Sequence, residues 1–177
     1  MPSQPESDGV LVPAVLGRAQ ECAKKLAEIA EGRGITVAVA ESLTSGQLAA
    51  ALGAAPDSAE WFRGGVVAYS SAVKHRVLGV PEVPVVSRPA ASAMAEGVRE
   101  LFDASIAAGV TGAGGPDGQD GEPPGSVWFA VAAADGVRAW HRQFDGAPEE
   151  VLDQVVCFGA ELLLAAAAGQ LDEVAVN

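Results

Sequence analysis

The first predicted element is a helix, because apolar residues recur every three or four positions near the start of the chain. Its apolar face consists of Val15, Ala19, Cys22, Leu26 and Ile29. Charged side chains such as Lys24 and Glu28 fall on the opposite face, and the pattern ends at Gly32 and Gly34. Residues 1–9 are polar and contain proline, so we interpret them as a flexible tail.

Short apolar runs without helical spacing follow, and they predict strands. The first three are residues 35–40 (ITVAVA), 64–69 (GGVVAY) and 105–111, and we interpret the first of them as a buried strand. Two more strands, residues 126–134 and 137–144, are joined by Asp135-Gly136, a strong signal for a two-residue hairpin. Helices are predicted from Gly46 to about Leu52, after Ser70 or Ser71, from Ser87 to Phe102, and from Pro148 to Gly169.

The order of these elements predicts the fold class. Helices between the first strands make those strands parallel, and the hairpin adds an antiparallel pair. We therefore expect an α/β fold, with a single three-layer α/β/α domain and a mixed sheet over residues 10–177. A chain of 177 residues is long enough for one domain with its own hydrophobic core.

Composition narrows the classes of partner. The chain has 23 acidic and 11 basic residues and a net charge of −12, whereas nucleic-acid binders cluster Lys and Arg, so we expect no direct nucleic-acid contact. The sequence shows no N-terminal signal in which positive charges precede an apolar stretch, and no uninterrupted apolar run long enough to span a membrane. We therefore expect a cytoplasmic protein without membrane contact. Cys22 and Cys157 fit buried free thiols in a reducing compartment better than a disulfide or a metal pair.

Candidate chemistry gathers where predicted strands end. Residues 41–46, 69–74 and 111–125 each follow the carboxyl end of a strand. In open α/β sheets that edge is where ligands bind. The convergence of three polar or glycine-rich segments on one edge therefore predicts a ligand site there.

Ser42 has two interpretations. A serine at a strand-to-helix turn lies near free N–H groups of the helix start, which can stabilise an oxyanion and so suit a nucleophile. Ser42, Thr44 and Ser45 are also good helix N-caps, and their spacing alone favours the capping role.

A serine nucleophile needs a base, and Lys74 is the candidate. His75 and His141 do not follow a strand end beside a serine, so a Ser-His-Asp arrangement is unsupported. Lys74 falls in the first turns of a helix that starts at the ligand edge, where partial burial would lower its proton affinity, and Tyr69 ends the preceding strand. The alternative is a solvated helix lysine and a half-buried tyrosine, which sequence physics alone favours.

The segment from Gly112 to Gly125 is long for a connection inside a compact domain, and such loops are usually functional or disordered. Its glycines allow the backbone to approach a ligand closely. A surface connector is the alternative, and the segment lacks the Gly-Lys-Ser/Thr ending of a phosphate-binding P-loop.

Three motifs together resemble the CinA C-terminal-domain family (competence/damage-inducible protein A). They are Glu41-Ser42-Leu43-Thr44-Ser45-Gly46, then residues 64–70 (GGVVAYS) with Lys74, and then Gly109-Val110-Thr111-Gly112 with Gly115-Pro116-Asp117-Gly118. The resemblance covers residues 10–168 with the same order and spacing. It is therefore far more specific than any one motif.

The resemblance implies an amidase that hydrolyses nicotinamide mononucleotide to nicotinic acid mononucleotide and ammonia, with no metal and no cofactor. It implies that Ser42 is the nucleophile, Lys74 the base and Tyr69 a helper residue. Substrate-binding residues implied by it are Glu41, Thr44, Ser45, Gly46, Thr111, Gly112, Gly115, Pro116, Asp117 and Gly118. The partner is then a small-molecule nucleotide, and we expect a homo-oligomer. Backbone donors, Arg88 or Arg76 are the alternatives for binding the phosphate.

The chain departs from the family's usual residues in four places. Ser45, Ser71 and Gly114 stand where Gly, Asn and Ala are usual, and Ala147 with Pro148 occupies a turn that commonly contains an Arg. The missing Arg would remove an anion contact. Two alternatives to the amidase therefore stay open: a catalytically silent nucleotide-binding or regulatory protein on the same fold, and a competence or DNA-repair accessory protein.

Overall fold

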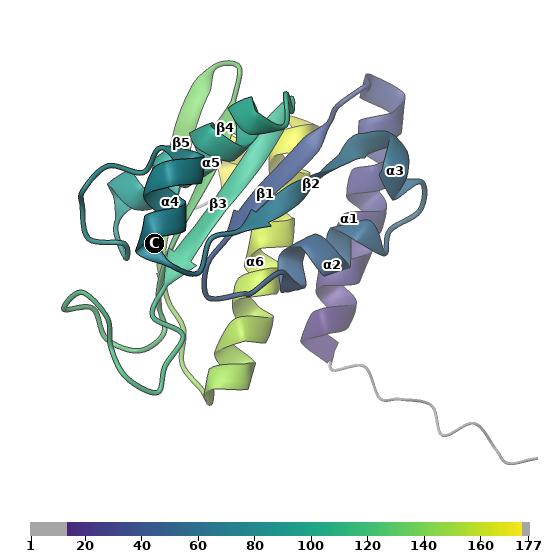
Figure 1. Cartoon of the computed structure of the whole chain (residues 1–177). Coiled ribbons are helices and arrows are strands. Elements are labelled where there is room, and N and C mark those ends of the chain that lie inside the picture. Colours follow the sequence, from purple (N-terminus) through teal and green to yellow (C-terminus); the bar gives the residue numbers. More distant parts are fainter. Residues whose placement is uncertain (1–13, 175–177) are drawn as a thin grey trace, which may run out of the picture.

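The computed structural model describes residues 14–174, so the tail predicted over residues 1–9 lies outside the described part. A five-stranded sheet lies between two layers of helices (Figure 1). Its strands are β1 (Val37–Glu41), β2 (Phe62–Val67), β3 (Ile106–Gly112), β4 (Ser126–Ala133) and β5 (Gly136–Gln143), in the spatial order β2-β1-β3-β4-β5. Strands β2, β1 and β3 are parallel, whereas β4 is antiparallel to both β3 and β5. The predicted α/β/α domain with a mixed sheet is confirmed.

Helices cover both faces of this sheet. They are α1 (Ala14–Arg33), α2 (Gln47–Gly53), α3 (Ser58–Trp61), α4 (Ser71–Leu78), α5 (Arg88–Leu101) and α6 (Pro148–Ala168), followed by a short 3-10 turn, η1 (Leu171–Glu173). Helices α1, α2 and α6 lie on one face, and α4 and α5 lie on the other (Figure 1). The predicted caps are present, because Ser70 and Ser87 bond the first turns of α4 and α5 and Gly169 ends α6.

The alternation of residues along β1 sets the two layers. Val37 and Val39 contribute to the core under α1 and α6, whereas Ala38 and Ala40 face the α5 side. Small residues bring α5 close to the sheet, since a Cβ on Gly109 would lie 2.5 Å from a carbonyl oxygen of α5. This close packing positions the strand ends that carry the site.

The hairpin register differs from the prediction. Ala133 pairs with Gly136, so the two-residue turn is Ala134-Asp135 and not Asp135-Gly136. In this register Phe129 pairs with Trp140, and both rings enter the same core layer. Aromatic cross-strand pairs of this kind stabilise a hairpin and fix its register.

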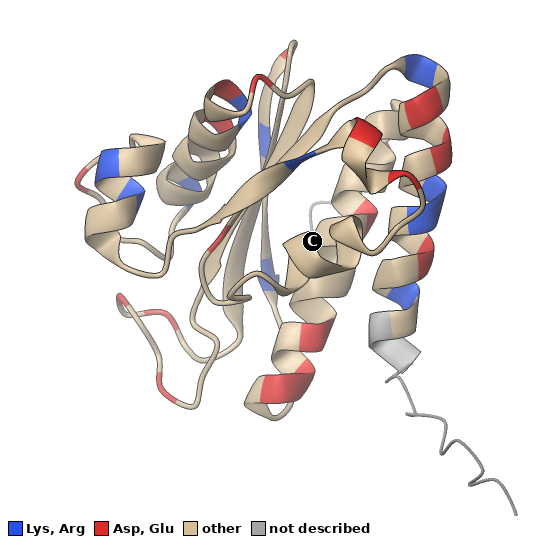
Figure 2. Ribbon diagram, turned by 45° about the vertical axis from the view of Figure 1, so that its right-hand side comes forward, with Lys and Arg blue, Asp and Glu red and all other residues tan. Residues whose placement is uncertain are grey.

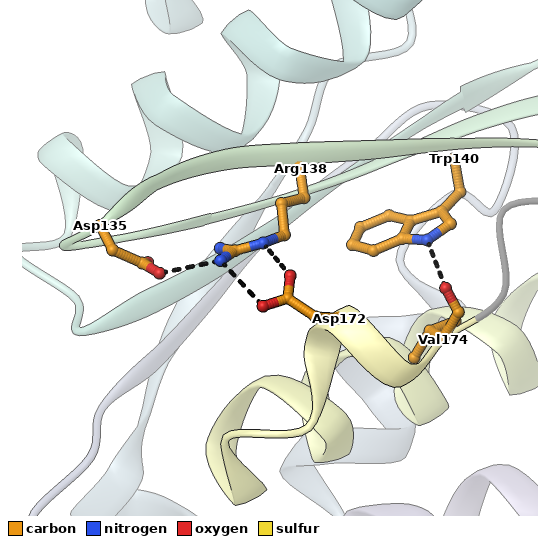
Figure 3. Close-up of polar contacts among 5 residues, drawn as sticks. All are labelled: Asp135, Arg138, Trp140, Asp172 and Val174. Atoms are coloured by element: carbon orange, nitrogen blue, oxygen red, sulfur yellow. Dashed lines mark hydrogen bonds and ion pairs between the residues drawn. The ribbon is translucent and has the colours of Figure 1, made fainter.

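The chain after α6 returns to the outer strand β5. Arg138 on β5 binds Asp172 and Asp135 through Nε and Nη2, at 2.6 Å and 3.0 Å respectively, and the Trp140 indole donates to the Val174 carbonyl (Figure 3). These contacts hold η1 against the hairpin. Neither η1 nor the short helix α3 was predicted, because each is a single turn whose formation depends on packing.

Helix α6 qualifies the expectation about membrane-spanning runs. It is long and apolar enough to cross a membrane by length and composition alone. Half of its most apolar stretch is buried within the fold, where α6 packs against α1. A core helix meets the same criteria, so its apolar character is explained by packing.

Candidate active site

Ser42 directly follows the central strand β1. Its amide donates to the Val110 carbonyl at 3.1 Å, which extends the β1–β3 ladder by one residue. The chain then turns sharply, because Ser45 and Gly46 both have left-handed backbone conformations with φ of 51° and 96°. The turn ends the strand and begins α2, so it leaves the Ser42 side chain at the carboxyl edge of the sheet.

Lys74 reaches Ser42 from helix α4. Its Nζ donates to Ser42 Oγ at 3.0 Å and to the Ala68 carbonyl at 2.7 Å, with the Tyr69 carbonyl further away at 3.5 Å. Only 1% of Lys74 is exposed, so the alternative of a solvated helix lysine is wrong. The structure therefore brings the predicted nucleophile and base into direct contact.

Burial also changes the proton affinity of Lys74. Loss of hydration lowers the pKa of the Lys74 ammonium below its usual value of 10.5, because burial disfavours the charged form. Asp120 on the glycine-rich loop acts in the opposite direction through its negative charge. The net lowering increases the fraction of neutral Lys74, the form that can accept a proton.

Tyr69 lies at the mouth of the site. Its side chain is 71% exposed, which is more than the half-buried position considered from the sequence. Tyr69 lines the same pocket as Ser42. Its ring is therefore placed to contact a bound ligand.

Glu41 and Thr44 lie beneath the turn. Both are almost fully buried, and neither lines the pocket. The Glu41 carboxylate accepts hydrogen bonds from Thr44 Oγ1 and from the amides of Gly46, Leu48 and Ala49. The resemblance implies substrate contact for both residues, but their polar side-chain atoms are engaged within the protein. The expectation that Glu41 bonds backbone donors and does not contact Lys74 is confirmed.

The same contacts settle which residue caps α2. The N-cap position is Gly46, which offers no side-chain hydrogen bond. Ser42, Thr44 and Ser45 therefore do not cap the helix by their hydroxyls, and the capping interpretation of these residues is wrong. Glu41 supplies the acceptor instead.

The pocket has a volume of about 460 Å³. Six of the predicted site residues line it: Ser42, Tyr69, Gly112, Gly115, Asp117 and Gly118. Four further lining residues, Leu43, Ala113, Gly114 and Gln119, fall in the segments that the sequence placed at the ligand edge. Two more, which were not in the predicted set, are Pro148 and Leu152. The last two belong to α6, and only the tertiary fold places the start of that helix beside the loop.

Lys74, which lies behind Ser42, does not line this pocket, and neither do four other predicted site residues besides Glu41 and Thr44. Thr111 is buried and donates its hydroxyl to the Val85 carbonyl at 2.7 Å. Pro116 lines a neighbouring cavity of about 270 Å³. Ser45 and Gly46 lie in the turn outside the pocket lining, and their left-handed conformations reverse the chain direction there.

Backbone N–H groups are available along the turn and the loop. Among the described residues of the turn and the loop, eight amides donate to no other residue: those of Leu43, Thr44, Gly114, Gly115, Asp117, Gly118, Asp120 and Gly121. Such amides bind oxyanions and phosphate groups. Neither Arg76 nor Arg88 lines the pocket, so these amides are the nearer candidates for an anion.

The charge around the pocket is acidic. Asp117 is the one charged side chain that lines it among the described residues. Acidic residues also lie on the glycine-rich loop and on the first turns of α6, whereas basic residues are spread over other elements (Figure 2). A ligand with a positive centre would be favoured here.

Comparison with known proteins agrees with this geometry. Residues 19–167 match the family model described as the CinA C-terminal domain. A CinA-superfamily protein from Klebsiella pneumoniae has a similar structure, with a TM-score of 0.81 and 34% identity over 85% of this chain and 98% of that one. Another from Escherichia coli has a TM-score of 0.81 and 30% identity, over 91% and 93% of the two chains.

Two curated relatives define what the similarity covers. A Pseudomonas putida protein named nicotinamide-nucleotide amidohydrolase PncC is 41% identical over 134 residues, which is 72% of this chain and 84% of that protein. A CinA-like protein from Gemmatimonas aurantiaca is 50% identical over 113 residues, but these are only 26% of its length. The chain thus spans about a quarter to a third of several CinA-like relatives.

Proposed function

Because the chain belongs to the CinA C-terminal-domain family, we propose that it hydrolyses the carboxamide of nicotinamide mononucleotide to nicotinic acid mononucleotide and ammonia. The similarity to the Pseudomonas putida amidohydrolase supports this reaction. The observation that carries the proposal is the 3.0 Å contact between Lys74 Nζ and Ser42 Oγ. A serine hydroxyl becomes an effective nucleophile only when a base lies within hydrogen-bonding reach.

In the first half of the reaction, neutral Lys74 accepts the hydroxyl proton as Ser42 Oγ attacks the carboxamide carbon. The carbonyl oxygen becomes an oxyanion, and the free amides of Leu43 and Thr44 are the donors nearest in sequence to the nucleophile. Lys74 then gives its proton to the departing nitrogen, so that ammonia leaves and an ester of Ser42 remains. The Ala68 carbonyl holds Nζ in place during both transfers.

In the second half, water replaces ammonia. Lys74 accepts a proton from water as the water oxygen attacks the ester carbon, and the proton then returns to Ser42 Oγ. The acid product is released and the pair is restored. This sequence uses the chain's own groups and water only, which fits a hydrolysis without a cofactor.

Substrate recognition follows from the lining of the pocket. The pyridinium ring of the substrate carries a positive charge, which suits the Asp117 carboxylate and the exposed face of Tyr69. The amides of Gly114, Gly115 and Gly118 can donate to the phosphate. Of the alternatives that the sequence left open for the phosphate, which were backbone donors, Arg88 and Arg76, the proposal therefore favours the backbone donors of the loop.

The experiment that tests this function is ammonia release from nicotinamide mononucleotide by the wild type and Ser42→Ala. We expect release by the wild type and a loss of at least about a thousandfold in the variant, since a removed nucleophile typically costs this much or more. Calorimetric binding of the nucleotide without ammonia release would contradict the proposal and would instead support a silent nucleotide-binding protein.

A further inference from the structure

Glu41 is a buried charge that the proposed reaction does not use. Among the described side chains, Glu41 and Lys74 are the two charged ones that are buried. Glu41 has no ion-pair partner in the described part of the chain and is held by hydrogen bonds alone. A buried carboxylate is strongly unfavourable unless it is well bonded, so the surrounding backbone must be arranged to bond it.

The four donors to Glu41 all belong to one short segment. Thr44 Oγ1 lies 2.6 Å from the carboxylate, and the amides of Gly46, Leu48 and Ala49 lie at 3.1, 3.1 and 2.8 Å. The last two amides are in the first turn of α2, where a negative charge also complements the helix dipole. The last residue of β1 is thus bonded directly to the start of α2, across Ser42.

The segment between these points has an unfavourable backbone conformation. Ser45 has φ of 51°, in the left-handed region that non-glycine residues rarely adopt. Such conformations persist only where surrounding contacts hold them. The bonds from Thr44 and Gly46 to the carboxylate lie on either side of Ser45 and can supply that restraint.

The distribution of the amides has a consequence for catalysis. Glu41 uses the amides of Gly46, Leu48 and Ala49, which leaves those of Leu43 and Thr44 free. We infer that Glu41 is a positioning residue, whose carboxylate fixes the turn so that Ser42 Oγ stays against Lys74 and the Leu43 and Thr44 amides stay available to the oxyanion. The inference rests on the proposed function of the same site.

The test is Glu41→Gln, which keeps the length of the side chain but replaces one acceptor oxygen with a donor that faces other donors. Two rates are measured: ammonia release from nicotinamide mononucleotide, and covalent labelling of Ser42 by a fluorophosphonate, followed by mass spectrometry with Ser42→Ala as the blank. We expect kcat and the labelling rate each to fall by about tenfold or more, with KM changed by less than about threefold.

The matched control is Gly169→Ala, which strains the left-handed residue at the end of α6 and lies outside the site. Each protein is labelled at a urea concentration that lies the same interval below its own unfolding midpoint. Under these conditions Gly169→Ala should be labelled at a rate within about twofold of the wild-type rate. Labelling of folded Glu41→Gln at the wild-type rate would overturn the inference, and so would an equal loss in Gly169→Ala.

Two further results separate positioning from other roles. The basic limb of the pH profile should keep its midpoint in Glu41→Gln, whereas a shift to lower pH would mean that Glu41 acts on Lys74 by charge and would overturn positioning. If Glu41→Gln does not fold, Thr44→Val removes the 2.6 Å bond and leaves the carboxylate; labelling at the wild-type rate in that variant would overturn the inference. Wild-type labelling of Ser42 without ammonia release would contradict only the proposed function.

Discussion

The nucleophile turn and the glycine-rich loop face the same pocket but differ in how their backbone donors are used. In the turn, residues 41–49, a buried carboxylate binds three amides and one hydroxyl. In the loop, residues 112–125, the amides of Gly114, Gly115, Asp117 and Gly118 bind no other described residue. Under the proposed function this difference corresponds to a division of roles, in which the internally bonded turn holds the reacting groups and the loop presents donors to the substrate.

The largest effect is expected when the base beside the turn is removed. Lys74→Ala should lower kcat by about a hundredfold to ten-thousandfold, the usual contribution of a general base. Lys74→Arg should not rescue it, because guanidinium stays protonated. Steady-state ammonia release tests both variants, and a Lys74→Arg enzyme with wild-type kcat would show that Lys74 supplies only a positive charge.

Two glycines of the loop differ in how closely other atoms pack against them, and alanine substitutions test this difference. A Cβ on Gly112 would lie 2.7 Å from the Ser126 carbonyl, whereas a Cβ on Gly114 would meet nothing nearer than 3.6 Å. Gly112→Ala should therefore lower the free energy of unfolding by about 1–3 kcal/mol, and Gly114→Ala should change it by less than about 0.5 kcal/mol. Urea denaturation measures both, and equal stability of the two variants would remove the distinction between a tightly packed glycine and one with open space around it.

Asp117 tests the charge preference of the loop. Asp117→Asn should lower the kcat/KM for nicotinamide riboside relative to that for the mononucleotide by about threefold to tenfold, because the riboside has the cationic ring without the phosphate. Asp103→Asn, in the exposed turn after α5, is the matched control and should leave the ratio unchanged. If the ratio of the two kcat/KM values is unchanged in Asp117→Asn, this carboxylate does not contribute to discrimination between substrates by charge.

The smallest effect connects the two regions. Asp120 on the loop raises the pKa of Lys74, so Asp120→Asn should lower that pKa further. In the proposed mechanism activity requires neutral Lys74 and rises with pH, so the basic limb of the variant's pH profile should move to lower pH. Asn can still accept the hydrogen bond from the Val86 amide. A limb that stays in place or moves to higher pH would exclude electrostatic contact between loop and base.

The sequence predicts those parts of the fold that local pattern controls. The serine caps of α4 and α5 depend on neighbouring residues, and they are where the pattern indicates. The valine-rich strands β1 and β2 lie within two residues of their predicted bounds, and β2 ends at Val67, before Tyr69. The burial of Lys74 could not be predicted, since α4 must first pack against the sheet. The lining by Pro148 and Leu152 depends on contact between segments far apart in the chain.

The role of Glu41 shows the same limit at the scale of one turn. The sequence shows that Glu41 comes at the end of a strand and just before a serine. A carboxylate at such a position can either contact a ligand or cap backbone amides. Which role Glu41 has depends on whether the amides of Leu48 and Ala49 come within hydrogen-bonding distance of its carboxylate. The left-handed conformations of Ser45 and Gly46 turn the chain so that they do.

The most direct test of the central claim, that Ser42 and Lys74 form a covalent amidase centre, is partitioning by hydroxylamine. The wild type is supplied with nicotinamide mononucleotide, or with the methyl ester of nicotinic acid mononucleotide, at increasing hydroxylamine, and the hydroxamate and free acid are quantified. A shared Ser42 ester predicts the same hydroxamate-to-acid ratio from both substrates, rising with hydroxylamine. Ammonia release that yields only the free acid at every hydroxylamine concentration would contradict the covalent mechanism.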